Sequence, residues 1–94
     1  NTTTWRPKEL QTHRYGQKEG GLSGPYLKQH VRELIRTCRH IAPRLPIIAA
    51  GGIETGDDAK MVVDDGASLV QIYTRFIFKG PAVVGEMRRA LAAI

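Results

Sequence analysis

The sequence predicts an α/β fold, namely the C-terminal portion of a (β/α)8 (TIM) barrel that is incomplete on its own. Short apolar runs alternate with amphipathic helical stretches, an order typical of parallel strands joined by right-handed crossovers. The two runs lie close together along the chain, as in the compact repeating unit of (β/α)-barrels. Because two parallel strands cannot close a sheet, we expect residues 1–94 to form the last strands and helices of a barrel domain.

A long helix is predicted after a polar segment, residues 1–24, that is punctuated by glycine. Pro25 suits the first turn of this helix, and Pro43 marks its end. Between them, apolar residues recur at steps of three and four, as on a helix with one buried face: Leu27, Val31, Leu34, Ile35, Cys38 and Ile41. Since Cys38 lies on this stripe, we expect a buried core thiol.

The rest of the chain predicts strand, helix, strand and helix in that order. The short apolar run 47–50 is typical of a strand covered on both faces. A helix follows from about Gly56 to Asp65, with Gly66 placed for a C-terminal glycine cap. Residues 68–73 predict a second buried strand, and a last helix starts at about Pro81.

The net charge of +5 raises the hypothesis of a nucleic-acid-binding protein, but the basic residues are scattered. Arg32, Arg36 and Arg39 share one predicted helix face, whereas Arg88 and Arg89 belong to the last helix. We therefore interpret them as parts of solvated helix faces and expect no nucleic-acid partner.

Gly51 and Gly52 directly follow the first predicted strand, and Tyr73 and Thr74 end the second. In (β/α)-barrels the functional groups collect at this edge, and phosphate often binds after the seventh and eighth strands. Glycine lets a backbone approach an anion closely, and the amides of a loop that opens into a helix point toward it. From these residues alone, a plain tight turn and a phosphate-holding loop both stay open.

The acidic residues behind the glycine pair are placed for a structural role. Carboxylates in a first helical turn stabilise the helix by roughly 0.3–1 kcal/mol, so we interpret Glu54, Asp57 and Asp58 as helix-start residues and not as catalysts. No metal site is expected, because none of the histidines has an i,i+4 partner or a cysteine partner: His13, His30 and His40.

Two further stretches are suited to polar ligands. "NTTTWRP" opens the chain with an amide and three hydroxyls, which can hydrogen-bond a small polar molecule. "GGLSG", residues 20–24, places a hydroxyl among glycines directly before a helix. It is a second candidate loop for an anion or a polar ligand.

Together these stretches resemble dihydroorotate dehydrogenase, in particular its quinone-linked, membrane-associated class 2. The matching pieces follow the order and spacing of the family: "NTT", "GGLSG", "LPIIAAGGI", "GASLVQIYT" and "FIFKGP". The resemblance covers nearly the whole chain and corresponds to the C-terminal third of that enzyme. Two departures stand out. Ala49 replaces a common glycine, and Pro25 replaces a basic residue, which removes a backbone donor beside "GGLSG".

The resemblance implies a (β/α)8 barrel that binds flavin mononucleotide (FMN) at its C-terminal face. Asn1 would hydrogen-bond the dihydroorotate or orotate ring, with Thr2 beside it. The residues implied to hold the flavin are Ser23, Gly24, Ala50, Gly51, Gly52, Ile72, Tyr73 and Thr74. Of these, the glycine pair, Tyr73 and Thr74 would grip the phosphate.

The implied reaction is the oxidation of dihydroorotate to orotate in de novo pyrimidine (UMP) biosynthesis. A proton leaves C5 to a base, a hydride leaves C6 for the flavin, and a membrane quinone is the final electron acceptor. The family's base is a serine on the loop of an earlier strand, and its flavin-contacting lysine also lies earlier. Neither Ser23 nor Lys79 takes these roles, so we expect no catalytic residue in this chain and no activity from the chain alone.

The remaining partners are also implied by the resemblance. Ile77 and Pro81 match a region that lines the quinone approach. The family is peripheral to the mitochondrial inner membrane or the bacterial cytoplasmic membrane, through parts that are not in this chain. The chain begins at Asn1 and its first methionine is Met61, which indicates a processed chain, a fragment or one piece of a larger assembly. The missing strands are then expected in another chain or in further residues.

Two other functions are compatible with the same sequence. The segment could be a non-catalytic structural remnant of the barrel, with a vestigial flavin site. It could also belong to another phosphate-binding (β/α)8 enzyme, although such an enzyme has no need of "NTT". Bound flavin separates the first alternative from the enzyme, and the effect of replacing Asn1 separates the second.

Overall fold

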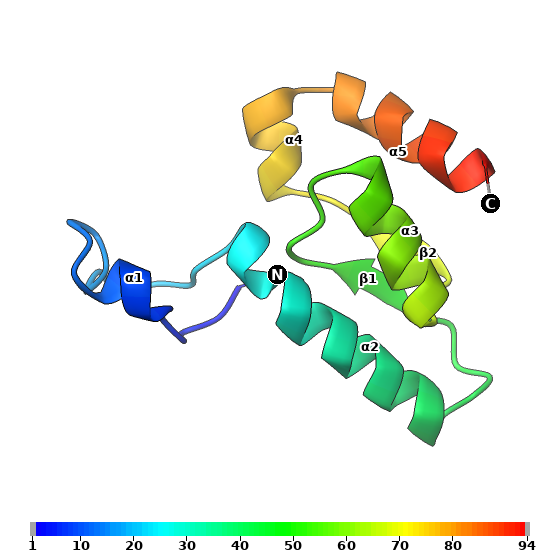
Figure 1. Ribbon diagram of the computed structural model, residues 1–94, viewed down its shortest axis with the longest axis horizontal. Helices are drawn as coiled ribbons and strands as arrows, with labels where there is room; N and C mark the ends of the chain where they lie inside the picture. The colour runs from blue at the N-terminus through cyan, green and yellow to red at the C-terminus, as the bar shows by residue number, and fades with distance from the viewer. Residues whose placement is uncertain (1, 94) are drawn as a thin grey trace.

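The computed structural model describes residues 2–93 of the chain. Figure 1 shows their arrangement, a small parallel sheet with helices packed over it and an N-terminal lobe set apart. In chain order the elements are α1 (Lys8–Gln11), the 3-10 turn η1 (Pro25–Leu27), α2 (Lys28–Ile41), β1 (Ile48–Ala50), α3 (Gly56–Asp65), β2 (Leu69–Gln71), α4 (Thr74–Lys79) and α5 (Ala82–Ala92). The predicted α/β class is confirmed.

The sheet consists of β1 and β2, which pair in parallel with Ala49 opposite Val70. Helix α3 makes the crossover between them, as the alternation of elements predicts. Successive residues of a strand point to opposite faces. Accordingly Ala49 is buried under the helices, whereas Ile48 and Leu69, one position earlier, are 58% and 63% exposed.

The prediction that both strands are covered on both faces is therefore wrong for residues 2–93. Figure 1 shows α3 lying over the sheet between α2 and α5, and no described element covers the face that carries Ile48 and Leu69. A continuous apolar run is typical of a strand that is buried on both faces. Among the described residues, the helices bury only the face that carries Ala49.

Helix α3 lies at the centre of the core. The buried cluster is formed by Ile35, Ala49, Ile53, Ala59, Val62, Ala67, Val83 and Met87. Its members come from α2, β1, the loop before α3, α3 itself, the turn after α3 and α5. The close fit needs a small residue at Gly56, since a Cβ there would lie 2.6 Å from Ala90 Cβ of α5.

The long helix begins as predicted, with Pro25 as the first residue of η1 and the Leu27 amide donating to the Gly24 carbonyl at 3.1 Å. Its buried face is narrower than the stripe predicts. Leu34 and Ile41 are 64% and 75% exposed. Cys38 is half-buried, so it is not the fully buried thiol expected, because α3 covers only one side of α2.

Helix α3 has the predicted bounds and both of the expected terminal signals. Its N-terminus is a capping box, in which Thr55 Oγ1 accepts from the Asp58 amide and the Asp58 carboxylate accepts from the Thr55 amide. Gly66 follows the last helical residue, and its amide donates to the carbonyl of Val63 at 3.0 Å. Glu54 is not part of the cap, which corrects the prediction that it stabilises the helix start.

The helices α1 and α4 have no counterpart in the sequence prediction. Helix α4 follows Tyr73 and ends at Gly80, where a sharp turn leads into α5. Its sequence "TRFIFK" places Phe76, Ile77 and Phe78 consecutively, so apolar residues do not recur on one face. A helix this short gives too few turns for a periodic signal.

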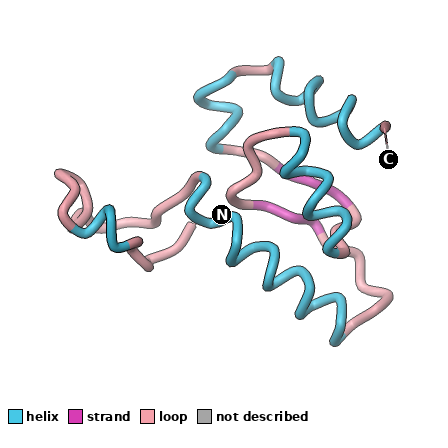
Figure 2. The backbone as a smooth tube through the Cα atoms, viewed as in Figure 1, coloured by secondary structure: helices cyan, strands magenta, loops and turns pink. Residues whose placement is uncertain are grey.

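The N-terminal lobe consists mostly of loop, as Figure 2 shows. Thr3 and Leu22 form an antiparallel bridge, with amide-to-carbonyl distances of 2.9 and 2.7 Å. The guanidinium of Arg6 organises the loop between them by donating to main-chain carbonyls of Thr3, Thr4, Trp5, Gly16, Lys18 and Gly20. Thr2 and Thr3 are thereby brought next to the "GGLSG" stretch.

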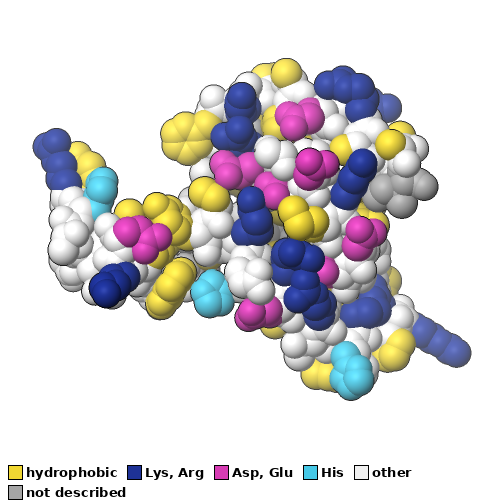
Figure 3. Space-filling view, viewed as in Figure 1, with side chains coloured by type: hydrophobic (Ala, Val, Ile, Leu, Met, Phe, Trp, Pro, Cys, Tyr) yellow, Lys and Arg dark blue, Asp and Glu magenta, His cyan; other side chains and the backbone are white. Residues whose placement is uncertain are grey.

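The arginines of α2 connect helices. Arg32 and Arg36 donate to the Asp65 carboxylate at 2.7 and 2.9 Å, and Arg39 donates to the Gly66 carbonyl. Figure 3 shows positive and negative side chains interspersed over this face. The prediction that these arginines belong to solvated helix faces is therefore wrong for Arg32 and Arg39, which are half-buried in contacts with the end of α3. No helix among residues 2–93 is both long and apolar enough to cross a membrane.

Candidate functional site

A cavity of about 410 Å³ lies at the carboxyl ends of β1 and β2. Three segments form its walls, residues 21–25, residues 50–54, and residues 71–75 together with Phe78. Its volume falls within the roughly 300–1,000 Å³ of small-molecule sites. This edge is where parallel α/β proteins place their ligands.

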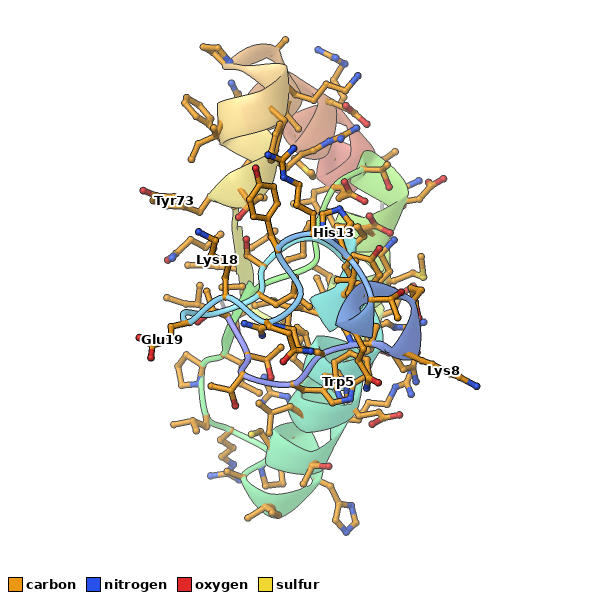
Figure 4. The ribbon with its side chains drawn as sticks, turned by 90° about the vertical axis from the view of Figure 1, so that its left-hand side faces the viewer. Trp5, Lys8, His13, Lys18, Glu19 and Tyr73 are labelled. Atoms are coloured by element: carbon orange, nitrogen blue, oxygen red, sulfur yellow. The ribbon has the colours of Figure 1, made fainter. Side chains whose placement is uncertain are left out.

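The cavity gathers residues that are far apart in the sequence. All of the residues that the sequence proposed for the flavin line it: Ser23, Gly24, Ala50, Gly51, Gly52, Ile72, Tyr73 and Thr74. A direct link joins two of the walls, since Thr74 Oγ1 donates to Ser23 Oγ at 3.0 Å. Tyr73 is 76% exposed, and Figure 4 shows its side chain projecting away from the body of the molecule.

Of the two residues proposed to bind the substrate, the structure describes only Thr2. Asn1 lies outside the described residues. Thr2 is exposed and lies against Gly21, where a Cβ would come within 2.4 Å of its side chain. Because Gly21 lines the cavity, Thr2 stands at its edge.

Glycine is required at Gly52 for two reasons. Its φ of +72° lies in the left-handed region, and a Cβ would approach the Lys28 amide nitrogen to 2.5 Å. The loop after β1 can therefore pack directly against the start of α2. At Gly24 the φ is +96° and no atom lies within 4 Å of the point where a Cβ would stand, so this backbone faces open space.

An ion pair between Lys28 and Asp58 helps to hold the loop after β1 in place. Lys28 Nζ lies 3.0 Å from Asp58 Oδ1, while the other carboxylate oxygen accepts from the Glu54 and Thr55 amides. Burial acts to raise the pKa of Asp58, but these hydrogen bonds and the lysine charge outweigh it, so the pKa is lowered. The site thus rests on an ionised, fully engaged carboxylate.

Arg75 and Glu54 also line the cavity, and the sequence did not predict that they form an ion pair there. Arg75 Nη1 donates to Glu54 Oε2 at 3.2 Å. Arg75 Nε is enclosed and has no hydrogen-bond partner among the described residues. The position of Arg75 directly after "QIYT" could have identified it as a site residue, because side chains at the carboxyl ends of parallel strands lie close together.

These side chains offer hydroxyl groups and one ion pair to a ligand. Among the described lining residues, Glu54 is the one carboxylate, and it is paired with Arg75. No described residue set has three or more His, Cys, Asp or Glu side chains that could share a metal ion. Left-handed glycine backbone and a lining arginine suit an anionic group, such as a phosphate.

Comparison with known proteins gives the family. The sequence model of dihydroorotate dehydrogenase matches residues 1–94. The chain belongs to the dihydroorotate dehydrogenase family.

Relatives of this dihydroorotate dehydrogenase segment carry the quinone-linked name. It is 39% identical to the mitochondrial dihydroorotate dehydrogenase (quinone) of Schizosaccharomyces pombe, over 99% of this chain and 21% of that protein. It is 46% identical to dihydroorotate dehydrogenase (quinone) of Xanthobacter autotrophicus, over 99% of this chain and 26% of that protein. The resemblance to class 2 is thereby confirmed.

The segment also superposes on solved dihydroorotate dehydrogenases. With the ligand-free enzyme of Eimeria tenella the TM-score is 0.90 at 38% identity, covering 100% of this chain and 26% of that one. The same organism's enzyme in complex with ferulenol gives a TM-score of 0.89. The chain therefore spans about a quarter of the length of these relatives.

Proposed function

We propose that these residues form the C-terminal part of a (β/α)8 barrel that oxidises dihydroorotate to orotate in pyrimidine (UMP) biosynthesis. The observation that carries the proposal is the cavity, because three separate family-like stretches converge on it at the carboxyl ends of β1 and β2. Family membership over residues 1–94 supports it independently.

The barrel architecture accounts for the face that the helices leave uncovered. In a (β/α)8 barrel, alternate strand residues point outward to the helices and inward to a packed interior. Ala49 and Val70 take the outward positions, and Ile48 and Leu69 take the inward ones. Further parallel strands, supplied by another chain or by further residues, would bury Ile48 and Leu69.

FMN is the cofactor that we propose for the cavity, and it would accept a hydride from the substrate when bound. The backbone of Gly51 and Gly52 would approach its phosphate, with Tyr73 and Thr74 on the opposite wall. Ser23 and Gly24 would lie against the flavin ring. The guanidinium of Arg75, a lining residue, fits an anionic ligand, as does the open backbone at Gly24.

Substrate positioning is the other role of this segment. Asn1 and Thr2 would hydrogen-bond the dihydroorotate ring, whose imide and carboxylate groups need polar partners. The bridge between Thr3 and Leu22 holds the segment after these residues against the "GGLSG" loop. The base that takes the C5 proton would come from an earlier strand.

A quinone is the proposed electron acceptor, at the membrane surface. Helix α4 offers apolar side chains for such an approach, since Ile77 and Phe78 are 65% and 78% exposed. Pro81 follows the turn at the end of α4. We place the enzyme peripherally on the mitochondrial inner membrane or the bacterial cytoplasmic membrane, attached by parts outside this segment.

The decisive experiment uses the complete barrel, meaning this segment together with the polypeptide that supplies the remaining strands. The purified barrel is expected to show flavin absorbance, to bind FMN after stripping, and to reduce a soluble quinone with dihydroorotate. Asn1→Ala should lower kcat/KM by about ten- to a hundredfold, because a hydrogen bond to the reacting ring is lost. Thr4→Ala, in the same hydroxyl run, is the matched control and should change little.

Two results would redirect the proposal. A colourless barrel that cannot be reconstituted with FMN would indicate the structural remnant. A flavin-containing barrel in which Asn1→Ala leaves dihydroorotate turnover unchanged would indicate another phosphate-binding (β/α)8 enzyme.

A further inference from the structure

Arg75 occupies a position from which it can reach an anion held between the two glycine-bearing walls of the cavity. It follows Thr74 directly, and both residues line the cavity with Gly51 and Gly52. Its side chain is 27% exposed, so it is largely enclosed by the segments around it.

Glu54 holds the guanidinium of Arg75 at one end only. The contact joins Arg75 Nη1 to Glu54 Oε2 at 3.2 Å, a single hydrogen bond and not the paired contact that a guanidinium and a carboxylate can make. The side chain is thereby held in place, and its outer nitrogen Nη2 makes no hydrogen bond within residues 2–93. The contact also offsets part of the negative charge of Glu54, which would otherwise repel an anion.

Arg75 Nε is shut off from solvent and has no acceptor among residues 2–93. Buried donors of folded proteins are almost always paired, and an unpaired charged donor is costly. Nε itself has no surface open to the cavity, so its acceptor would come from the part of the barrel outside residues 2–93. The outer guanidinium nitrogens are the donors that can face a phosphate in the cavity that Arg75 lines.

We propose that Arg75 is a side-chain anchor for the flavin phosphate, donating from Nη2 to a phosphate oxygen while Glu54 holds Nη1 and orients the guanidinium. This inference rests on the proposed function. Arg75 would then supply a fixed positive charge to a grip otherwise made of backbone amides and hydroxyls. A charge-assisted bond of this kind is about twice as strong as a neutral one.

The test compares two flavins that differ only in the phosphate. FMN and riboflavin are titrated into the stripped complete barrel, and dissociation constants are obtained from the quenching of flavin fluorescence. Arg75→Met should weaken FMN binding by about ten- to a hundredfold and change riboflavin binding by less than about twofold. Arg75→Lys keeps the charge but not the planar set of guanidinium donors, so it should recover only part of the loss.

Two control variants separate a phosphate contact from other effects. Lys79→Met removes a positive charge from the same helix outside the cavity, and it should leave both dissociation constants unchanged. Glu54→Gln removes the orienting carboxylate together with its negative charge, and FMN binding should not weaken as it does in Arg75→Met.

If Arg75→Met weakens both flavins equally, or if Glu54→Gln weakens FMN as much as Arg75→Met does, the pair is structural and the anchor assignment is wrong. Tight FMN binding that Arg75→Met leaves unchanged overturns the anchor alone. A wild-type barrel that binds neither flavin overturns the proposed function, and the anchor with it.

Discussion

Asp58 shows how much one side chain can hold together in this protein. It is 4% exposed, it caps α3 together with Thr55, and it pairs with Lys28 at the start of α2. The same carboxylate accepts from the Glu54 amide, in the loop that lines the cavity. One residue therefore couples a helix terminus, a helix–helix contact and a wall of the candidate site.

The lowered pKa of Asp58 predicts a pH-dependent stability. Because its pKa is lower in the folded than in the unfolded protein, the ionised form stabilises folding above the unfolded value of about 3.9. This contribution is lost as the pH falls through the folded pKa. Asp58→Asn should destabilise the complete barrel by about 1–3 kcal/mol at pH 7, and the difference from wild type should shrink below about pH 4.

Urea unfolding at a series of pH values measures this difference. Asp57→Asn, in the same helical turn but exposed, is the control and should cost under about 0.5 kcal/mol at every pH. If the loss of unfolding free energy in Asp58→Asn stays constant down to pH 3, Asp58 stabilises the protein through packing and not through its charge.

At the scale of elements, α3 is the piece on which the others assemble. It crosses between β1 and β2, contacts α5 along its length and meets α2 through the Asp65 carboxylate. Hydrogen bonds from Arg32 chiefly lower the pKa of Asp65, against the effect of burial. At the other end of α3, the Gly56 amide donates to Glu86 Oε1 of α5 at 3.2 Å.

Two glycines that face different surroundings test the α3–α5 contact. Gly56→Ala would bring its Cβ to 2.6 Å from Ala90 Cβ, so it should destabilise the barrel by about 1–3 kcal/mol. Gly85→Ala, within α5, meets only the movable end of Arg89 at 3.2 Å and should stabilise by about 0.5–1 kcal/mol.

Unfolding midpoints in urea report both effects, and the double variant Gly56→Ala with Ala90→Gly should regain most of the loss. Equal effects of the two glycine substitutions would mean that the close approach of α3 and α5 is not a constraint in solution.

At the scale of the whole molecule, the described residues form a thin slab. Its extents are 40 × 34 × 17 Å, and its radius of gyration is 14.2 Å, against about 12 Å for a compact domain of this length. The sheet face with Ile48 and Leu69 and the helix α4 with Phe76, Ile77 and Phe78 leave apolar side chains exposed. Apolar surfaces of this kind mark interfaces or aggregation hazards.

We therefore expect the isolated chain to lack dihydroorotate oxidation and to self-associate. Size-exclusion chromatography should show oligomers, and a hydrophobic dye should bind. Leu69→Ala should reduce dye binding to the isolated chain yet destabilise the complete barrel by about 2–5 kcal/mol, because there the side chain would be buried. If the isolated chain were monomeric and active, the expectation that further strands and the base come from outside this segment would be wrong.

The periodic parts of the fold follow from the sequence. The helix 56–65 and its Gly66 cap were predicted at their observed positions, since capping and periodicity are local properties. The helix α4 was missed, because six residues give no period to detect. The exposure of Leu34 and Ile41 was missed as well, because burial depends on which neighbours are present and not on the pattern of one helix.

The sequence by itself determined the family, the α/β order and the cavity-lining residues, because the matching stretches keep a fixed spacing that survives without coordinates. The tertiary structure decided how those stretches meet. The Thr74–Ser23 hydrogen bond and the Arg75–Glu54 pair join residues that are 51 and 21 positions apart. Such contacts are fixed by the parallel register of β1 and β2 and by the packing of α3, and no local pattern encodes them.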